Sequence, residues 1–160
     1  MTYDIALLKA DIIDELGKLN RLVEEYVKVA PVIAQPAESV TFLERSGIGY
    51  ILHNFYNGCE NIFRSIALFF ENDLSPQSWH RDLLKRMTMN VDGYRPRVVD
   101  EQLYLILNDL RSFRHKFRHL YGFELEWERE QAIAQKLPKA MEMLNSQLHE
   151  FMKLLDLIVE

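Results

Sequence analysis

The sequence is poor in cysteine, in glycine and proline, and in long apolar runs. Its single cysteine, Cys59, excludes an internal disulfide framework and a cysteine-rich zinc site. Six glycines and five prolines are too few for a chain of many short strands and turns, so helices are favoured. The longest strongly apolar stretch, residues 65–70, is far shorter than the ~20 residues that span a bilayer. The first segment carries aspartates, unlike a signal peptide. We therefore expect a cytoplasmic protein without membrane contact.

The bulk composition is that of an ordinary globular protein. Apolar residues make up 48% of the chain and charged residues 27%, which argues against disorder. The length of 160 residues predicts one domain over residues 1–160. The net charge of −5 excludes general binding of polyanions, so that any nucleic-acid contact needs a local basic patch.

Apolar residues recur at three- and four-residue spacing along most of the chain, which is the pattern of amphipathic helices. The pattern predicts helices over residues 2–30, 38–71, 78–89, 100–122 and 128–159. Pro31 is expected to end the first helix and Gly122 the fourth, while Pro138 implies a kink or a break in the last. With short connections between them, these segments predict an all-α, up-and-down bundle of four long helices and one short one.

The most unusual segment is RSFRHKFRHLYGF, residues 111–123. It contains four Lys and Arg residues, two histidines and no acid, in a chain that is acidic overall. Phe113 and Phe117 are four residues apart and are expected to face the core. A phosphate-bearing ligand is the natural complement to the basic side chains.

Arg114 and His119 suit cleavage of RNA without a metal. Arginine can hold a phosphate with two hydrogen bonds and offset transition-state charge. Histidine can take the proton of a ribose 2′-hydroxyl or donate one to the leaving 5′-oxygen. Attack by the 2′-oxygen would leave a 2′,3′-cyclic phosphate, and DNA, which lacks this hydroxyl, would be spared. Five residues separate the pair, about 140° around a helix, so convergence needs a frayed helix end or arginine's full reach.

Arg114, His119 and Tyr121 form an Arg-x4-His-x-Tyr pattern that resembles the motif of HepT-type HEPN ribonuclease toxins. The resemblance implies a small all-helical domain and a metal-independent endoribonuclease that acts as a homodimer, with both motifs facing one cleft. Arg114 and His119 would be catalytic, the substrate would be RNA, with tRNA one candidate, and no cofactor would be needed. The resemblance also implies an MntA-like minimal nucleotidyltransferase antitoxin that silences the toxin by adding AMP to Tyr121.

Other residues are assigned supporting roles. The candidates for RNA contact are Arg111, His115, Lys116 and Arg118, and RNA contact is also the alternative role of Tyr121. His115 stands where the family often has asparagine. It could share a metal with His119, but no third ligand is suitably spaced, and we predict no metal site. Glu60 has two readings, an exposed polar position or a buried carboxylate that pairs with an arginine of the motif.

Two other function classes remain open. A non-catalytic HEPN-type module would bind RNA or a nucleotide, or serve a nucleotidyltransferase as its target and partner. A purely structural helical dimer would carry the basic segment as a solvated helix face. The remaining histidines, His53, His80 and His149, are isolated in the sequence, and packing or surface roles are expected for them.

Overall fold

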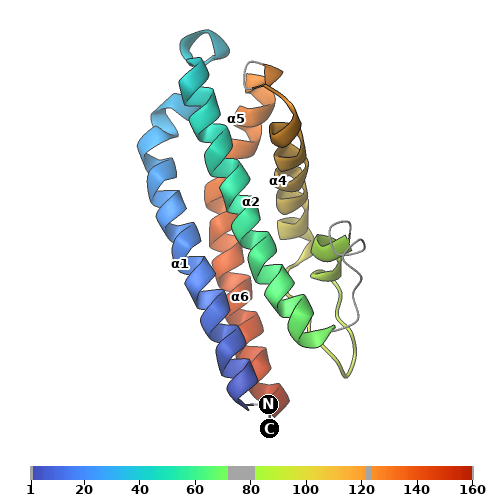
Figure 1. Cartoon of the computed structure of the whole chain (residues 1–160). Coiled ribbons are helices and arrows are strands. Elements are labelled where there is room, and N and C mark those ends of the chain that lie inside the picture. Colours follow the sequence, from blue (N-terminus) through green and yellow to red (C-terminus); the bar gives the residue numbers. More distant parts are fainter. Residues whose placement is uncertain (1, 72–81, 122–123, 160) are drawn as a thin grey trace.

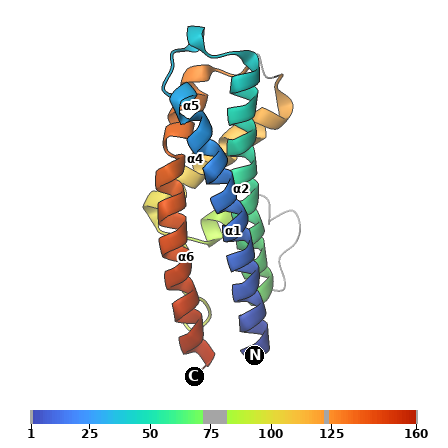
Figure 2. The same cartoon turned by 90° about the vertical axis from the view of Figure 1, so that its left-hand side faces the viewer.

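The helices run alternately up and down the molecule in the computed structural model, which describes residues 2–71, 82–121 and 124–159 (Figure 1). The four long helices are α1 (Thr2–Ile33), α2 (Phe42–Phe70), α4 (Glu101–His119) and α6 (Leu137–Val159). Two shorter elements, the 3₁₀ turn η1 (Ala37–Ser39) and helix α5 (Trp127–Gln135), precede α2 and α6. Within the described ranges there is no strand, and the predicted all-α bundle is confirmed. Both chain ends lie at the same end of the bundle (Figures 1 and 2).

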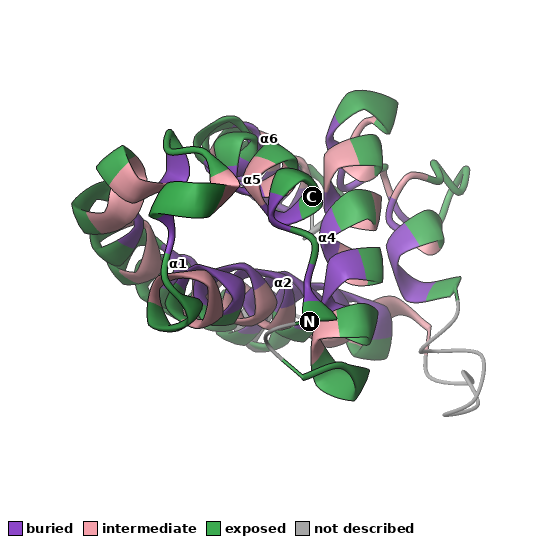
Figure 3. Cartoon of the chain, turned by 90° about the horizontal axis from the view of Figure 1, so that it is seen from above, coloured by how far each residue is buried: buried purple, intermediate pink, exposed green. Residues whose placement is uncertain are grey.

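The apolar stripes of the helices meet in one core. α2 packs against α1 and α4, and α6 also packs against α1 (Figures 1 and 2). Seen from above, the buried positions of each helix face the interior (Figure 3). All four long helices contribute side chains to this core that are 0% exposed, among them Ile12, Leu52, Phe63, Leu107 and Leu148. Burial of such a side chain contributes about 1.5–3 kcal/mol. None of the described helices combines the length and apolarity needed to cross a membrane.

The start of α2 is set by a capping box. The Thr41 hydroxyl accepts a hydrogen bond from the Glu44 backbone N–H at 3.1 Å, and the Glu44 carboxylate accepts one from the Thr41 N–H at 2.9 Å. Both orphan donors are thereby satisfied. The predicted start at residue 38 was wrong, because residues 37–39 form the separate turn η1.

Pro31 and Pro138 both lie inside observed helices, at opposite ends. α1 continues through Pro31 to Ile33, so the expected end at residue 30 was wrong. The ring removes one backbone donor near the helix end, where the loss can be tolerated. Pro138 lies in the first turn of α6, where its missing N–H is not needed. The predicted break is confirmed, since α5 and α6 are separated at Lys136.

The segment before α4 is only partly described. Residues 82–86 are helical, whereas residues 78–81 of the predicted short helix lie outside the described part. Asp100 caps α4 as expected, accepting from the Leu103 N–H at 2.8 Å. The helix ends at His119 instead of reaching Gly122, which also lies outside the described residues.

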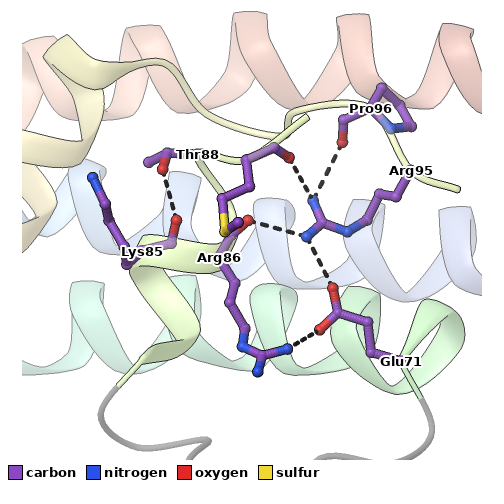
Figure 4. A network of polar contacts seen from close by, with 7 residues as sticks. Glu71, Lys85, Arg86, Thr88, Arg95 and Pro96 are labelled. Carbon is purple, nitrogen blue, oxygen red and sulfur yellow. Dashed lines mark hydrogen bonds and ion pairs between the residues drawn. The ribbon is translucent and has the colours of Figure 1, made fainter. Parts of the chain in front are cut away.

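A buried arginine ties the loop before α4 to the end of α2 (Figure 4). Arg95 is 2% exposed and donates to Glu71 Oε1 at 3.0 Å. It also donates to the backbone carbonyls of Arg86, Met89 and Pro96. The second Glu71 oxygen pairs with Arg86 at 2.8 Å. Although burial opposes its charge, these arginines lower the pKa of Glu71 and keep it ionised.

Two glycines of α2 stand in contrasting surroundings. A Cβ added to Gly49 would lie 2.7 Å from the Phe117 ring and 2.8 Å from the Glu130 carboxylate. A Cβ added to Gly47 would meet nothing within 4 Å. Gly49 therefore allows α2, α4 and α5 to approach one another closely.

These two positions make a matched pair for stability measurements. We expect Gly47→Ala to raise the free energy of unfolding by about 1 kcal/mol, the helix propensity difference between the two residues. Gly49→Ala should lower it, because an aromatic ring and a buried carboxyl group must both shift. Urea denaturation of the two variants measures this, and equal stabilisation by both would contradict the packing described here.

Candidate active site

Residues 111–119 of the basic segment occupy the second half of α4. Lys116, Arg118 and His119 lie in its last turn, where positive charge is favoured by the helix dipole. Phe113 is buried and Phe117 packs against the core, with their ring centroids 5.7 Å apart. The predicted orientation of these two rings is confirmed. It leaves Lys116, Arg118 and His119 exposed.

Arg114 is turned inward, against α2. It is 9% exposed, and its guanidinium donates to Asn57 Oδ1 at 3.0 Å and to Glu60 Oε2 at 2.8 Å. The guanidinium carbon also lies 4.7 Å from the centroid of the Tyr56 ring, a cation–π contact. Three side chains of one helix therefore hold the motif arginine in a single orientation.

The sequence left two readings of Glu60 open, an exposed polar position or a buried carboxylate. The structure shows the buried carboxylate. It is 8% exposed, and its second oxygen accepts from Arg64 at 3.1 Å. The formal charges of Arg64, Glu60 and Arg114 sum to one net positive charge. Burial, followed by the negative charge of Glu60, raises the pKa of Tyr56, so that this phenol stays neutral.

His53 also belongs to this group of residues, although it looked isolated in the sequence. Its ring lies 5.5 Å from that of Phe117, and its Nδ1 is buried without a hydrogen-bond partner. Burial, together with the charges of Arg118 and Arg114, lowers the pKa of His53. The signal that could have revealed it is its helical spacing of four and seven residues from Asn57 and Glu60.

His119 lies on a different side of α4. Its ring packs against that of His115, with centroids 4.8 Å apart, and both side chains are exposed. Both also line a cavity of about 730 Å³ whose other walls come mainly from α5 and the segment before it. Arg114 does not line this cavity. It lines a second hollow of about 620 Å³ formed by Arg111, Ser112, Arg114, His115, Lys116 and Arg118.

The expected convergence of Arg114 and His119 does not occur within one chain. α4 remains helical through His119, so the helix end is not frayed between the two residues. Their side chains keep the ~140° separation of an ideal helix, and the Arg114 guanidinium reaches toward Glu60 on α2. His115 and Lys116 line both hollows and connect the two sides.

The other motif residues are placed as follows. Tyr121, two residues beyond the end of α4, is 72% exposed. Arg111 hydrogen-bonds to Asn108 Oδ1, one turn earlier, at 3.0 Å. Lys116 and Arg118 are exposed. In the described part of the chain, no three His, Cys, Asp or Glu side chains gather in a way that could hold a metal ion.

A buried acid, Glu130 of α5, lines the same cavity as His119. It is 0% exposed, and neither carboxylate oxygen has a hydrogen-bond partner. Burial raises the pKa of Glu130 to about 8, against the opposing charge of Arg45. The carboxyl group is therefore mostly protonated at neutral pH.

Comparison with protein families shows which family this chain belongs to. The family model described as HepT-like protein matches residues 47–155, which is more than half of the chain. The chain belongs to the HepT-like protein family. The matched part of this HEPN-type protein begins in α2 and ends in α6, and includes His53, Glu60 and the motif of α4. No curated protein and no solved structure matches the chain.

The raised pKa of Glu130 predicts a specific dependence of stability on pH. Between pH 4.5 and about 8 the folded protein keeps a proton that the unfolded chain releases, so this group's contribution to stability falls as pH rises through that window. We expect Glu130→Gln, neutral and of equal size, to remove this slope and raise the free energy of unfolding at pH 8. Urea denaturation from pH 5 to 9 measures it, and an unchanged slope in the variant would refute the assignment.

Proposed function

We propose that this HepT-like protein is an endoribonuclease that cuts RNA without a metal ion and acts as the toxin of a toxin–antitoxin pair. The observation that carries the proposal is the fixed orientation of Arg114 by Glu60 and Asn57. An arginine used for catalysis must be held in place before the substrate arrives, because reorganisation during the reaction raises the barrier. A solvated helix face would not bury its arginine among three partners on another helix.

The charge balance around Arg114 supports phosphate binding. One carboxylate, Glu60, serves two guanidinium groups, those of Arg64 and Arg114. A phosphate diester could neutralise the remaining positive charge. The neighbouring Arg111 and Arg118 would extend the basic surface along an RNA backbone.

The chemistry follows from the residue types. The 2′-oxygen of the ribose loses its proton to a base and bonds to phosphorus, while the bond from phosphorus to the 5′-oxygen breaks and that oxygen receives a proton. Arg114 would stabilise the charge on the phosphate, and His119 would transfer one of the two protons. The products are a 2′,3′-cyclic phosphate and a free 5′-hydroxyl.

The divergence of Arg114 and His119 supports action as a homodimer. Two copies that face each other could bring Arg114 of one chain and His119 of the other to one phosphate. A docking face for a second copy is offered by the outer side of α2. The side chains along this stripe are exposed or half-buried, and none of them is charged. They are Leu43, Tyr50, Asn54, Asn61 and Leu68. Side chains of this kind can pair with their own copies across a two-fold axis.

Cleavage of RNA by the purified protein tests the enzyme claim. We expect tRNA or total RNA to be cut in EDTA, and His119→Ala to lower the rate by at least about 100-fold, the usual contribution of a proton-transfer group. His149→Ala is the matched control, because His149 is an exposed histidine of α6, and its rate should equal that of the wild type. RNA binding that is lost in Arg114→Ala, without any cleavage by the wild type, would identify a non-catalytic binding module instead.

Tyr121 is the residue that we propose as the target of an antitoxin. Its exposure supports access by a nucleotidyltransferase of the MntA type. With ATP and such an enzyme, we expect mass spectrometry to find AMP units on Tyr121 and RNA cleavage to stop. Tyr121→Phe should stay unmodified and active. Modification of another tyrosine, such as the 61%-exposed Tyr50, would refute this choice of residue.

A further inference from the structure

The edge of α2 that faces the basic segment of α4 carries three polar side chains in a row. His53, Asn57 and Glu60 are spaced by four and three residues, so they lie one above another along the helix. The latter two hold Arg114. His53 lies one turn nearer the start of α2, against Phe117. The two helices run antiparallel (Figure 1), and the contact with Phe117 places His53 beside the turn of α4 that follows Arg114.

Mainly positive charges surround the His53 ring. From α4, the charges of Arg118 and Arg114 act on it. On α2, Glu60 lies two turns away and is already paired with two arginines. From α5, the Glu130 carboxyl group lies against Gly49, one turn before His53. These surroundings disfavour the imidazolium, so that the imidazole is neutral near pH 7.

We propose that His53 is the general base of the RNA cleavage, an inference that rests on the function proposed above. Its imidazole takes the proton of the 2′-hydroxyl as the 2′-oxygen bonds to phosphorus, and the phosphate is held by Arg114 and Arg118. The bond to the 5′-oxygen then breaks, and the His119 of the facing second copy donates the proton that this oxygen needs. The first imidazole ends protonated and the second neutral, so that water can restore both.

The geometry assigns the two histidines to different roles. Because the Nδ1 of His53 is enclosed, we assign Nε2 as the nitrogen that takes the proton, with the proton of the neutral ring on Nδ1. His53 packs against Phe117 and is acted on by the charges of Arg114 and Arg118, whereas His119 lines the cavity on the α5 side. The motif alone supplies one acid–base residue per chain, and cleavage needs two proton transfers.

Substitution of His53 tests the proposal directly. We expect His53→Ala to lower kcat/KM for RNA by about 10²–10⁴-fold, and added imidazole to restore part of the rate, because a free base can enter the space left by the ring. A purely structural histidine would not respond to imidazole in this way. His149→Ala should keep the wild-type rate and should not respond to imidazole. Circular dichroism checks that each variant is folded.

The pH profile gives a second test that leaves His53 in place. The acid limb of kcat/KM should coincide with the titration of the His53 ring measured by NMR, below the ordinary histidine pKa of about 6.5. Of the two neighbouring charges, that of Arg118 lowers the pKa of His53 more, so Arg118→Gln should move both the limb and the titration to higher pH. Arg129→Gln, an equal charge change on α5, should move neither.

The outcomes separate this inference from the proposed function. If the wild type cuts no RNA, the proposed function is overturned and this inference falls with it. If the wild type cuts RNA and His119→Ala is inactive, but His53→Ala keeps its rate and its acid limb, only the role of His53 is overturned. The role of His53 is also overturned if folded His53→Ala loses activity that imidazole does not restore, and Arg118→Gln does not move the acid limb of kcat/KM.

Discussion

The ion pair between Glu60 on α2 and Arg114 on α4 constrains the rest of the site. Removing a charge from water costs several kcal/mol, and only well-formed contacts offset this cost. Here Asn57, Arg64 and the Tyr56 ring complete the contacts of the two charges. Sliding or rotating α4 against α2 would leave a charge buried and unpaired. The pair therefore sets the register of the two helices, and with it the position of every basic side chain on α4.

This register divides the motif between two sides of one helix. With Arg114 turned toward α2, Phe117 lies against His53, and His119 lies on the side of α4 that faces α5. The close approach at Gly49 brings α5 against the same region and encloses Glu130. The site is therefore a junction of three helices, in which a buried ion pair, a neutral histidine and a protonated carboxyl group lie within a few turns of one another.

The helices themselves could be predicted because helix formation depends on a local period. Apolar residues at three- and four-residue spacing indicated each long helix, and the resemblance carried by the motif of α4 agrees with the HepT-like family match. The errors lay at the ends. Residues 37–39 form a separate turn because Thr41 and Glu44 cap α2, and α1 passes through Pro31 because one lost hydrogen bond near a helix end is tolerable.

By itself, the sequence determined the all-α class, the basic segment and the motif, since each depends on residues close together in the chain. Only the tertiary structure decided which of the two readings of Glu60 holds, that His53 is a neighbour of Arg114 and Arg118, and that Arg114 and His119 point apart. Spacing along a helix says which side chains share a face. Which helix meets that face, and at what height, depends on how the cores of both helices interlock.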